Sequence, residues 1–372
     1  MVVVRPKLVE SWLSDARLRA VLHTISFPGF QDKETSTRAA LPCATLDTLS
    51  KLHIHFMLTF PFEALSMNYE PHGVMSSQLD DIYERLIEKR HGGGYCLQIN
   101  LLYREVLAKL AFRFVGVLGR VFSPISNSWT GLTHTATLVY LPSHIASDRG
   151  SMVYYLSDVG FGSSPHRPML LRNEWQEFGR GGDKFRMVHR HVHPQSTFEP
   201  AGDEQVDQHV AQIARDQSVW ILQHHRHGTP DWLDCYSFST AECFYPDYHA
   251  SNKATSHPES QPFATMILVV RYLLHAPLVE LSEELLERDK LPKQLYPYHP
   301  SVVEQRMIVG DKHIIKVGDQ QVLSEKIADE GHRVDLLKHN FALLTHVEKD
   351  DALREIRGKP SSLNALSTRS TR

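Results

Sequence analysis

The sequence predicts an α+β fold in which a helical N-terminal part is followed by strands. After the three glycines at residues 92–94, which allow a tight turn, Ile99, Leu102 and Val106 recur at the spacing of a buried helix face. Beyond about residue 112, the apolar residues fall in short segments rich in β-branched and aromatic side chains. The length of 372 residues, with 42% apolar and 22% charged residues, predicts a globular protein of about two or three domains.

Residues 1–112 read mainly as helices. The segments with mixed polar and apolar faces are Val9–Leu22, Leu46–Leu58 and Leu79–Glu88, and the helix after the glycines follows them. Between the second and third segments, Pro61 ends a helix, and Phe60 and Phe62 stand beside Glu63. We interpret this stretch as a loop with hydrophobic anchors.

The strand pattern begins after the fourth helix. The first predicted strands are Phe114–Phe122, His134–Leu141 and Met152–Val159, and Phe178–His191 is a hairpin that turns at residues 181–183. Gln195–Asp216 is polar, which predicts a surface excursion. Further along, we expect strands at Met266–Leu274, Gln305–Val309 and His313–Val317, a hairpin turn at residues 310–312, a helix at Val334–Leu344, and a disordered tail from residue 349.

Charge and composition exclude several classes of protein. The net charge of −3 gives no field that favours nucleic acid or an anionic membrane. The apolar start is too short for a signal peptide, and no run approaches the ~18 apolar residues of a membrane helix. Four cysteines without a dense framework are typical of a reducing compartment, so we expect the cytoplasm. The oligomeric state stays open.

Histidine is frequent, with 23 residues and two dense runs at 189–193 and 224–227. Metal binding is one interpretation of these runs. Neither run has Cys or carboxylate partners at the spacing of a zinc site, and both lie in polar, turn-like sequence. We therefore predict solvated loops and no metal site.

Cys96 is the strongest candidate for a reactive residue. It falls where the glycine loop becomes a helix, and the N–H groups and the positive dipole end at that place favour an anion. A thiol held there is expected to lose its proton more easily, and the thiolate is the nucleophilic form. The alternative is an ordinary buried thiol beside a glycine turn, because free cysteines are often buried.

Strand pairing offers a partner for this thiol. If the hairpin between His134–Leu141 and Met152–Val159 is centred near Ala146, His134 lies opposite Asp158. Directly opposite residues point to the same face with their Cβ atoms ~5 Å apart. Asp158 would then orient the imidazole, and Cys96, His134 and Asp158 would form a triad in which His takes the thiol proton. In the alternative, Asp158 caps a strand and His134 merely begins one.

Here the sequence resembles a known family, the arylamine N-acetyltransferases. Their nucleophile motif is Arg-Gly-Gly-x-Cys-x-x-x-Asn, and residues 93–100 match it except at the arginine. The family's histidine follows a Thr-Gly-x-Thr stretch, as His134 does, and Asp158 opens the Asp-Val-Gly-Phe-Gly motif. The Pro-Phe-Glu-Asn-Leu signature has its counterpart at residues 61–65, and the late Asn and Ser/Thr-x-Pro-x-Ser signature at Asn252 and residues 256–260. Five motifs in order span roughly residues 50–345.

The chain also departs from the family pattern. Gly92 stands where the motif has arginine, with Arg90 as the nearest arginine, and Ala64 replaces an asparagine. The connection from His134 to Asp158 is longer than usual, and residues 195–216 look like an insertion. None of these departures removes a triad member.

The resemblance implies a fold of three domains with the triad arranged as in papain-like cysteine peptidases. Residues 1–112 would form a helical bundle that carries Cys96, and residues 113–235 a β-barrel that carries His134 and Asp158. Residues 236–348 would supply an interdomain segment and an α/β lid, before the tail at 349–372.

The implied reaction is ping-pong transfer of an acetyl group from acetyl-CoA through acyl-Cys96 to an arylamine or arylhydrazine, with no permanently bound cofactor. A backbone N–H, that of Cys96, would stabilise the oxyanion. The family's acceptor pocket nominates Phe62, Phe161, Ser163 and Pro165. Contacts to CoA are carried over to Thr130, Gly131 and Ser256.

Three alternatives remain open. The same triad serves a cysteine hydrolase, which would act on amides or acyl groups without CoA. A catalytically silent binding protein could keep the fold. Within the preferred interpretation, propionyl- or malonyl-CoA could replace acetyl-CoA. A malonyl donor needs a cation near the acyl site, for which Arg167 is close in sequence, although sequence does not place its side chain.

Overall fold

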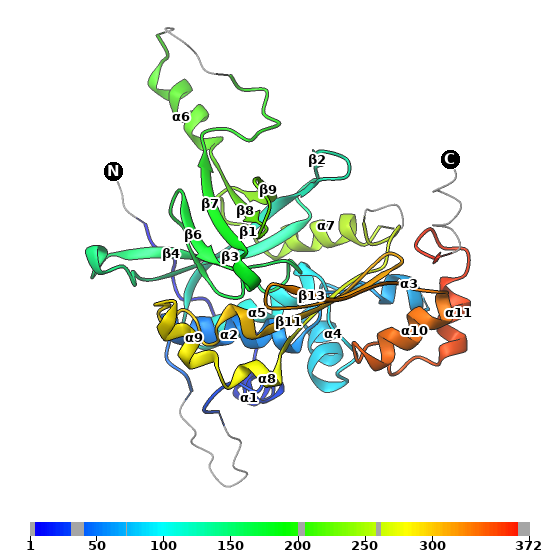
Figure 1. Cartoon of the computed structure of the whole chain (residues 1–372). Helices are drawn as coiled ribbons and strands as arrows, with labels where there is room; N and C mark the ends of the chain where they lie inside the picture. The colour runs from blue at the N-terminus through cyan, green and yellow to red at the C-terminus, as the bar shows by residue number, and fades with distance from the viewer. Residues whose placement is uncertain (1–3, 31–40, 72, 200–204, 258–261, 364–372) are drawn as a thin grey trace.

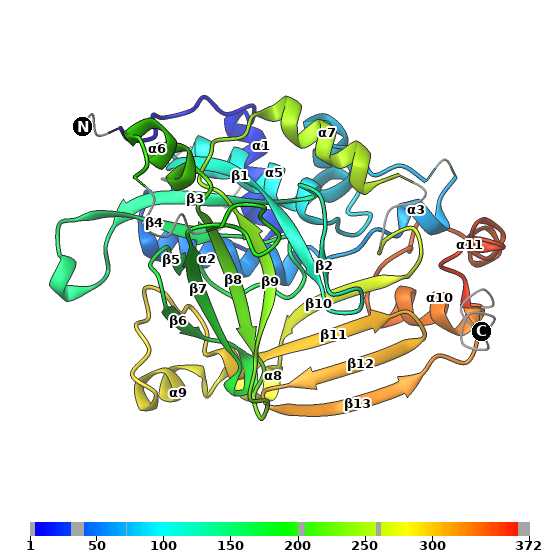
Figure 2. The same cartoon turned by 90° about the horizontal axis from the view of Figure 1, so that it is seen from above.

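The computed structural model describes residues 4–30, 41–71, 73–199, 205–257 and 262–363. A helical N-terminal part comes first, a large antiparallel sheet follows, and a smaller sheet with helices comes last (Figure 1). This is the order that the sequence predicts. The small sheet lies beside strands of the large one, and the two turns at residues 181 and 318 are in contact (Figure 2).

The N-terminal part packs its helices around one apolar core. Leu52, Phe56, Leu102 and Val106 are fully buried in it. α1 begins at Asp15 and not at Val9 as predicted, because Ser14 caps the helix by accepting from the N–H of Arg17. The elements are α1 (Asp15–Thr24), α2 (Leu46–Thr59), α3 (Ser66–Tyr69), α4 (Leu79–Tyr83), the π-helical turn η1 (Glu84–Glu88) and α5 (Cys96–Lys109).

Within the described residues, nine strands form the large, barrel-like sheet. Eight of them follow the order β5-β4-β3-β1-β9-β8-β7-β6, and β2 pairs with β1. Val117, Leu138, Met187 and Leu222 fill its interior. The strands are β1 (Arg113–Ser123), β2 (Ser128–Trp129), β3 (His134–Pro142), β4 (Met152–Ser157), β5 (Met169–Leu170), β6 (Trp175–Phe178), β7 (Lys184–Arg190), β8 (Val219–His225) and β9 (Trp232–Phe238), with short 3₁₀ turns η2 (Ala146–Asp148) and η3 (Arg180–Gly182).

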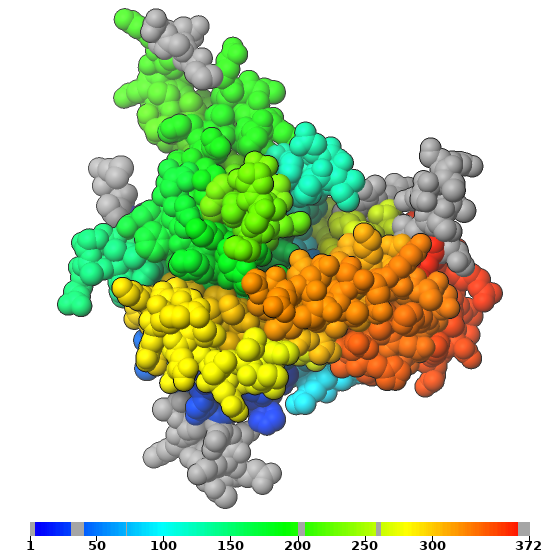
Figure 3. All heavy atoms as spheres, in the orientation of Figure 1, coloured from blue at the N-terminus to red at the C-terminus, as the bar shows by residue number. Residues whose placement is uncertain are grey.

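The C-terminal part carries a second sheet and its own core. Val269, Ile308, Val334 and Phe341 are buried where helices cover the sheet β10-β11-β12-β13. On the face shown in Figure 3, the yellow and orange atoms of this part cover most of the helical part, whose blue and cyan atoms emerge at the lower edge. The elements are α7 (Tyr245–Thr255), β10 (Leu268–Leu274), α8 (Ala276–Val279), α9 (Ser282–Arg288), η4 (Pro300–Val302), β11 (Val303–Val309), β12 (Lys312–Val317), β13 (Gln320–Lys326), α10 (Glu330–His339) and α11 (Lys349–Ile356).

The predicted disordered tail is wrong for residues 349–363. α11 buries Ala352 and Ile356, and Ser361 is fully buried behind it. Residues 364–372 lie outside the described residues. α10 begins before the predicted Val334, because Asp329 caps it, and ends at His339, because Ala342 and Leu344 have positive φ.

The histidine runs were predicted to be solvated loops, and this is wrong for the first residues of each run, whereas residues 191–193 and 226–227 do lie outside the strands. His189 lies in β7, and His224 and His225 lie in β8. His224 stacks on Phe185 with ring centroids 4.5 Å apart, and its Nε2 lies 3.0 Å from Asp183 Oδ2. Polar residues alternate with apolar ones here because each strand has only one face toward the barrel core.

The predicted register of the hairpin β3–β4 is also wrong, by two residues. Leu138 pairs with Leu156, and Thr137 with Ser157, so the hairpin is centred on Ser147 and not on Ala146. Continuing this register places Asp158 opposite Ala136. Because the shift is an even number of residues, His134 and Asp158 still share one face, as diagonal neighbours.

The predicted surface excursion at Gln195–Asp216 contains α6 (Gln208–Asp216), which projects from the barrel (Figures 1 and 3). Val210 and Ile213 on this helix are each 54% exposed. Among the described residues, none of the helices combines the length and the apolar character needed to span a bilayer.

Candidate active site

Cys96 is the first residue of α5, as predicted. The loop before it is held tightly, because Gly94 donates its N–H to the carbonyl of Pro61 (3.2 Å) and a Cβ on Gly93 would lie 1.7 Å from that same oxygen. At the start of a helix the N–H of Cys96 has no carbonyl one turn back, so it is available for an incoming oxyanion. The thiol is 5% exposed, and its sulfur lies 3.6 Å from the carbonyl oxygen of Thr133.

His134 and Asp158 meet across the end of the β3–β4 hairpin. The imidazole Nε2 lies 2.8 Å from Asp158 Oδ2, and both side chains are buried. Burial by itself lowers the pKa of His134, but the charges of Asp158 and Cys96 and hydrogen bonds to both raise that pKa to about 10. Because Nε2 faces Asp158, Nδ1 is the nitrogen left for the thiol. The structure therefore brings the three predicted triad residues together.

Asn100 fixes the Asp158 carboxylate, a role that the sequence analysis missed. Its side-chain amide donates to Asp158 Oδ1 (2.9 Å) and to the carbonyl of Thr135 (2.8 Å), and its own oxygen accepts from the N–H of Val159 (3.1 Å). The N–H of Gly160 also donates to Asp158 Oδ1 (3.0 Å). Burial opposes ionisation of Asp158, but the His134 charge and these hydrogen bonds lower its pKa. The spacing of Cys96 and Asn100, one helical turn apart, was the signal in the sequence.

Arg85 of the preceding turn contacts the loop in which Gly92 stands at the position of the motif arginine. Arg85 in η1 donates from Nη2 to Glu63 Oε1 (3.0 Å) and from Nε to the carbonyl of Gly93 (3.3 Å). The N–H of Gly93 donates to the same Glu63 oxygen (3.1 Å). A Cβ on Gly92 would lie 3.7 Å from Arg85 Nη2, so the Arg85 guanidinium occupies the space beside the missing side chain. Arg90, the nearest arginine in sequence, is exposed and has φ +52°.

Aromatic side chains surround the triad. Phe161 lies edge-on to His134, with ring centroids 5.2 Å apart, and the Tyr236 ring contacts both, at 4.4 Å from His134 and 4.9 Å from Phe161. Phe62 packs against Gly162, in the loop after Asp158, and against Phe263. Two of the predicted pocket residues, Phe62 and Phe161, thus lie in the loops that frame the triad.

The other two pocket candidates differ from each other. Ser163 is exposed, whereas Pro165 is buried and its carbonyl oxygen lies 2.9 Å from Nε2 of His53. His53 Nδ1 in turn lies 3.0 Å from the hydroxyl of Ser157, the residue before Asp158. Pro165 therefore anchors the pocket loop to α2 rather than presenting an open surface.

The three CoA candidates come from two segments that the structure brings together. Ser251 on α7 donates to the carbonyl of Leu132 (2.7 Å), in the loop that begins with Thr130 and Gly131. Ser256 follows directly after α7. Gly131 is exposed, with open space where a Cβ would be, and Thr130 caps its own loop by accepting from the N–H of Val121 (2.9 Å).

Arg167 does not supply a cation to the acyl site. Its guanidinium is buried over the ring of Tyr296, 3.7 Å from the ring centroid, donates to the carbonyl of Phe178, and lies 3.9 Å from Glu177. These partners belong to the β6 region and to the segment after α9. Among the described residues, no group of three His, Cys, Asp or Glu side chains is placed to hold a metal ion.

A family model described as N-acetyltransferase matches residues 45–295 of the chain. The chain belongs to the arylamine N-acetyltransferase family. One relative, the arylamine N-acetyltransferase of Escherichia coli (strain K12), is 26% identical over 231 residues, which cover 61% of this chain and 67% of the relative. Another, the N-malonyltransferase FDB2 of Fusarium pseudograminearum, is 24% identical over 211 residues, 53% of this chain and 55% of the relative. The match thus spans between about half and two thirds of these relatives.

Solved structures of the arylamine N-acetyltransferase family match nearly the whole chain. The enzyme from Mycobacterium abscessus superposes with a TM-score of 0.63 at 19% identity, covering 91% of this chain and 93% of that one. The enzyme from Mycobacterium marinum, solved in complex with CoA, gives 0.62 at 20% identity, with 91% and 98% covered. The predicted family and the predicted α+β fold class are both confirmed.

Proposed function

We propose that this protein transfers an acyl group from acyl-CoA to an arylamine or arylhydrazine, with Cys96 as the nucleophile, His134 as the acid and base, and Asp158 as the residue that orients His134. One observation supports this most strongly. Cys96 at the start of a helix from the N-terminal part faces a buried His134–Asp158 pair from the barrel. The names of the relatives, one an N-acetyltransferase and one an N-malonyltransferase, support amine acylation.

The first half-reaction loads the enzyme. The raised pKa of His134 favours transfer of the Cys96 thiol proton to the imidazole, and the thiolate is the nucleophilic form. The thiolate attacks the thioester carbonyl, and the N–H of Cys96 donates to the oxyanion. The carbon–sulfur bond to CoA then breaks. His134 gives its proton to the departing CoA thiolate, which leaves acyl-Cys96 beside a neutral imidazole.

The second half-reaction returns the enzyme to its starting state. The amine attacks acyl-Cys96, and neutral His134 takes the amine's proton. Collapse of the tetrahedral intermediate expels Cys96 as the thiolate and releases the amide. The imidazolium–thiolate pair is restored, so no external oxidant, reductant or metal enters the cycle.

We assign the acceptor to the side of the triad framed by Phe62 and Phe161, where an aryl ring can stack on aromatic faces. Ser163 is the exposed polar residue on the same loop. Thr130, Gly131 and Ser256 are proposed contacts for CoA, and the hydrogen bond between Ser251 of α7 and Leu132 supports this by joining the two segments from which they come. The four cysteines are free thiols, which fits the reducing cytoplasm that we propose as the compartment.

The test is a mass measurement in two stages. The protein is incubated with acetyl-CoA without an amine, and in parallel with propionyl- and malonyl-CoA, and the adduct is mapped to a peptide. We expect one acyl group on Cys96 that an aromatic amine removes as the amide, with the preferred donor giving the fastest loading. Loss of the acyl group to water as fast as to the amine would favour the hydrolase. No adduct with any donor would exclude the proposed function.

A further inference from the structure

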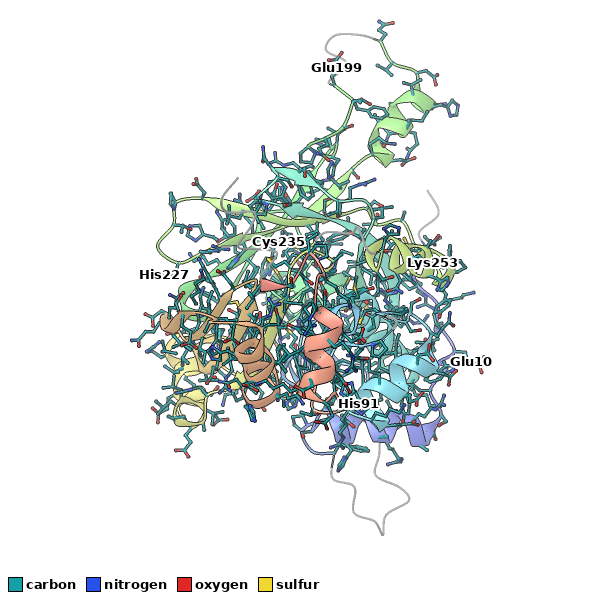
Figure 4. The ribbon with its side chains drawn as sticks, turned by 90° about the vertical axis from the view of Figure 1, so that its right-hand side faces the viewer. Glu10, His91, Glu199, His227, Cys235 and Lys253 are labelled. Carbon is teal, nitrogen blue, oxygen red and sulfur yellow. The ribbon has the colours of Figure 1, made fainter. Side chains whose placement is uncertain are left out.

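A cavity of about 210 Å³ lies behind the loop that carries Cys96. Its wall includes Thr59, Pro61, Arg90, Gly92, Arg271 and Leu343, from the end of α2, the nucleophile loop, β10 and the segment after α10. His91 lies between Arg90 and Gly92 in the sequence, and Figure 4 labels it near the lower end of the C-terminal helix drawn in faint red.

This cavity is separate from the proposed acyl site. Phe62 lies against Gly162 beside the triad, whereas its neighbour Pro61 lines the cavity. Successive side chains of an extended segment point to opposite faces. The cavity therefore lies on the other side of the same short stretch of chain, and nothing in the proposed reaction uses it.

The charges around the cavity are unbalanced. Two guanidinium groups line it, those of Arg90 and Arg271, and no carboxylate is among its described lining residues. Neither arginine forms an ion pair with a described acidic side chain. The lack of an ion pair costs little free energy at Arg90, because this side chain is exposed and water solvates its charge. Arg271 is half-buried, so its charge is less well solvated.

One nitrogen of the Arg271 guanidinium lacks a hydrogen-bond partner among the described residues. The group donates to the carbonyl of Phe341, and its buried Nε is the atom without a partner in the part of the chain that the structure describes. Directly opposite it on β11 stands Arg306, which is bound to Glu304 and to the carbonyl of Asn340. Like charges directly opposite each other destabilise a sheet. Burial and the charge of Arg306 both lower the pKa of Arg271. An anion beside Arg271 would offset both of these unfavourable effects on the charged guanidinium.

We propose that this cavity binds a small dianion, inorganic phosphate, held between the guanidinium groups of Arg90 and Arg271. The cavity is smaller than the 300–1,000 Å³ of sites for drug-sized ligands, which suits a compact ion. Guanidinium forks match the geometry of phosphate and carboxylate oxygens. A bound ion would tie Arg90 and β10 to the same ligand and so stabilise the loop that leads to Cys96.

Isothermal titration with inorganic phosphate at constant ionic strength tests the proposal, with succinate as a second probe that separates phosphate from dicarboxylate recognition. The variants Arg90→Gln and Arg271→Gln remove one charge each, and Arg149→Gln on the exposed β3–β4 turn is the matched control. We expect one saturable phosphate site, a dissociation constant at least tenfold higher in each cavity variant, and no change of this constant in the control. Arg90→Gln is at an exposed position, so its fold is expected to survive even if Arg271→Gln destabilises the sheet.

Cys96→Ala should keep phosphate binding unchanged, because the thiol does not line the cavity, and this separates the proposal from the acyl-transfer function. If succinate binds saturably and phosphate does not, the ligand is a dicarboxylate and the assignment to phosphate is wrong. The proposal is overturned if neither anion binds saturably, or if both cavity variants bind phosphate as tightly as the control.

Discussion

The guanidinium of Arg85 and the carboxylate of Glu63 form a buried ion pair, 3.0 Å between Nη2 and Oε1, that closes a ring around Gly93. Glu63 is fully buried, and its second oxygen accepts from the N–H of Leu65 (2.5 Å). Both backbone groups of Gly93 are engaged, its N–H by Glu63 and its carbonyl by Arg85. The position of Cys96, three residues further on, therefore depends on a side chain outside the nucleophile motif.

Arg85→Gln should destabilise the protein and slow loading of the enzyme with acetyl-CoA. Removing one partner leaves a buried carboxylate uncompensated, which costs about 3–5 kcal/mol in other proteins. We expect about 3 kcal/mol here in urea unfolding, because the Arg85 side chain is 20% exposed. Arg149→Gln, on the exposed turn between β3 and β4, is the matched control and should leave stability and loading unchanged. Equal effects of the two variants would show that Arg85 does not hold the loop.

Cys96→Ala should remove the acyl adduct and lower kcat by roughly 10⁴-fold or more, as loss of the nucleophile does in other triads. Cys235→Ser tests whether the effect is specific to position 96. Cys235 is buried in the barrel (Figure 4), and burial raises its pKa to about 12, so it should not be acylated. Intact-mass and single-turnover measurements on both variants decide the assignment. Substantial amide formation by Cys96→Ala would refute the mechanism.

Asp158→Asn should give a folded protein with kcat lowered by about 10³- to 10⁴-fold, because an amide in place of the carboxylate permits the wrong imidazole tautomer. The pKa of His134 should also fall, since the Asp158 charge opposes the effect of burial on it. NMR titration of the imidazole measures that fall directly. Asp231→Asn, at an exposed position, is the control. Activity within a few fold of wild type would make Asp158 a structural residue.

His53 should make stability depend on pH. Burial lowers its pKa to about 4, although the hydrogen bond to Pro165 acts in the opposite direction. Between pH 6.5 and 4 the unfolded chain binds a proton that the folded chain excludes, so the free energy of unfolding falls as the pH falls through this window, by about 3 kcal/mol in total.

His53→Gln keeps a donor and an acceptor at this place but does not titrate. Urea unfolding between pH 4 and 8 should show a flatter profile for this variant, whereas His23→Gln, at an exposed site, should follow the wild type. A wild-type slope retained in His53→Gln would assign the pH dependence to other groups.

Sequence reasoning succeeded where the signal is local. The start of α5 at Cys96 and the hairpin turn at residues 310–311, one residue shorter than predicted, follow from glycine and apolar spacing over a few residues. The His134–Asp158 contact was predicted from the wrong register, and it holds only because the error was two residues and preserved the face. Local patterns do not determine the centre of a long hairpin loop.

The remaining misses involve contacts between distant segments. Arg85 reaches Glu63 through a π-helical turn, in which Lys89 donates to the carbonyl of Glu84, and no propensity of single residues indicates such a turn. α11 is polar and buries only two apolar side chains, so its sequence reads as disordered although tertiary contacts order it.

The segment after α11 returns to the beginning of the molecule. Lys359 Nζ donates to the carbonyls of Met67 (3.2 Å) and Asn68 (2.9 Å), and Ser361 donates to the side chain of Asn68. α3, which contains Met67 and Asn68, directly follows the loop that carries Phe62. During synthesis at 5–20 residues per second, residue 361 leaves the ribosome about 15–60 s after α3 does. For most of translation, α3 of the nascent chain therefore lacks the hydrogen bonds from Lys359 and Ser361. A chain truncated near residue 348 would lack these hydrogen bonds permanently.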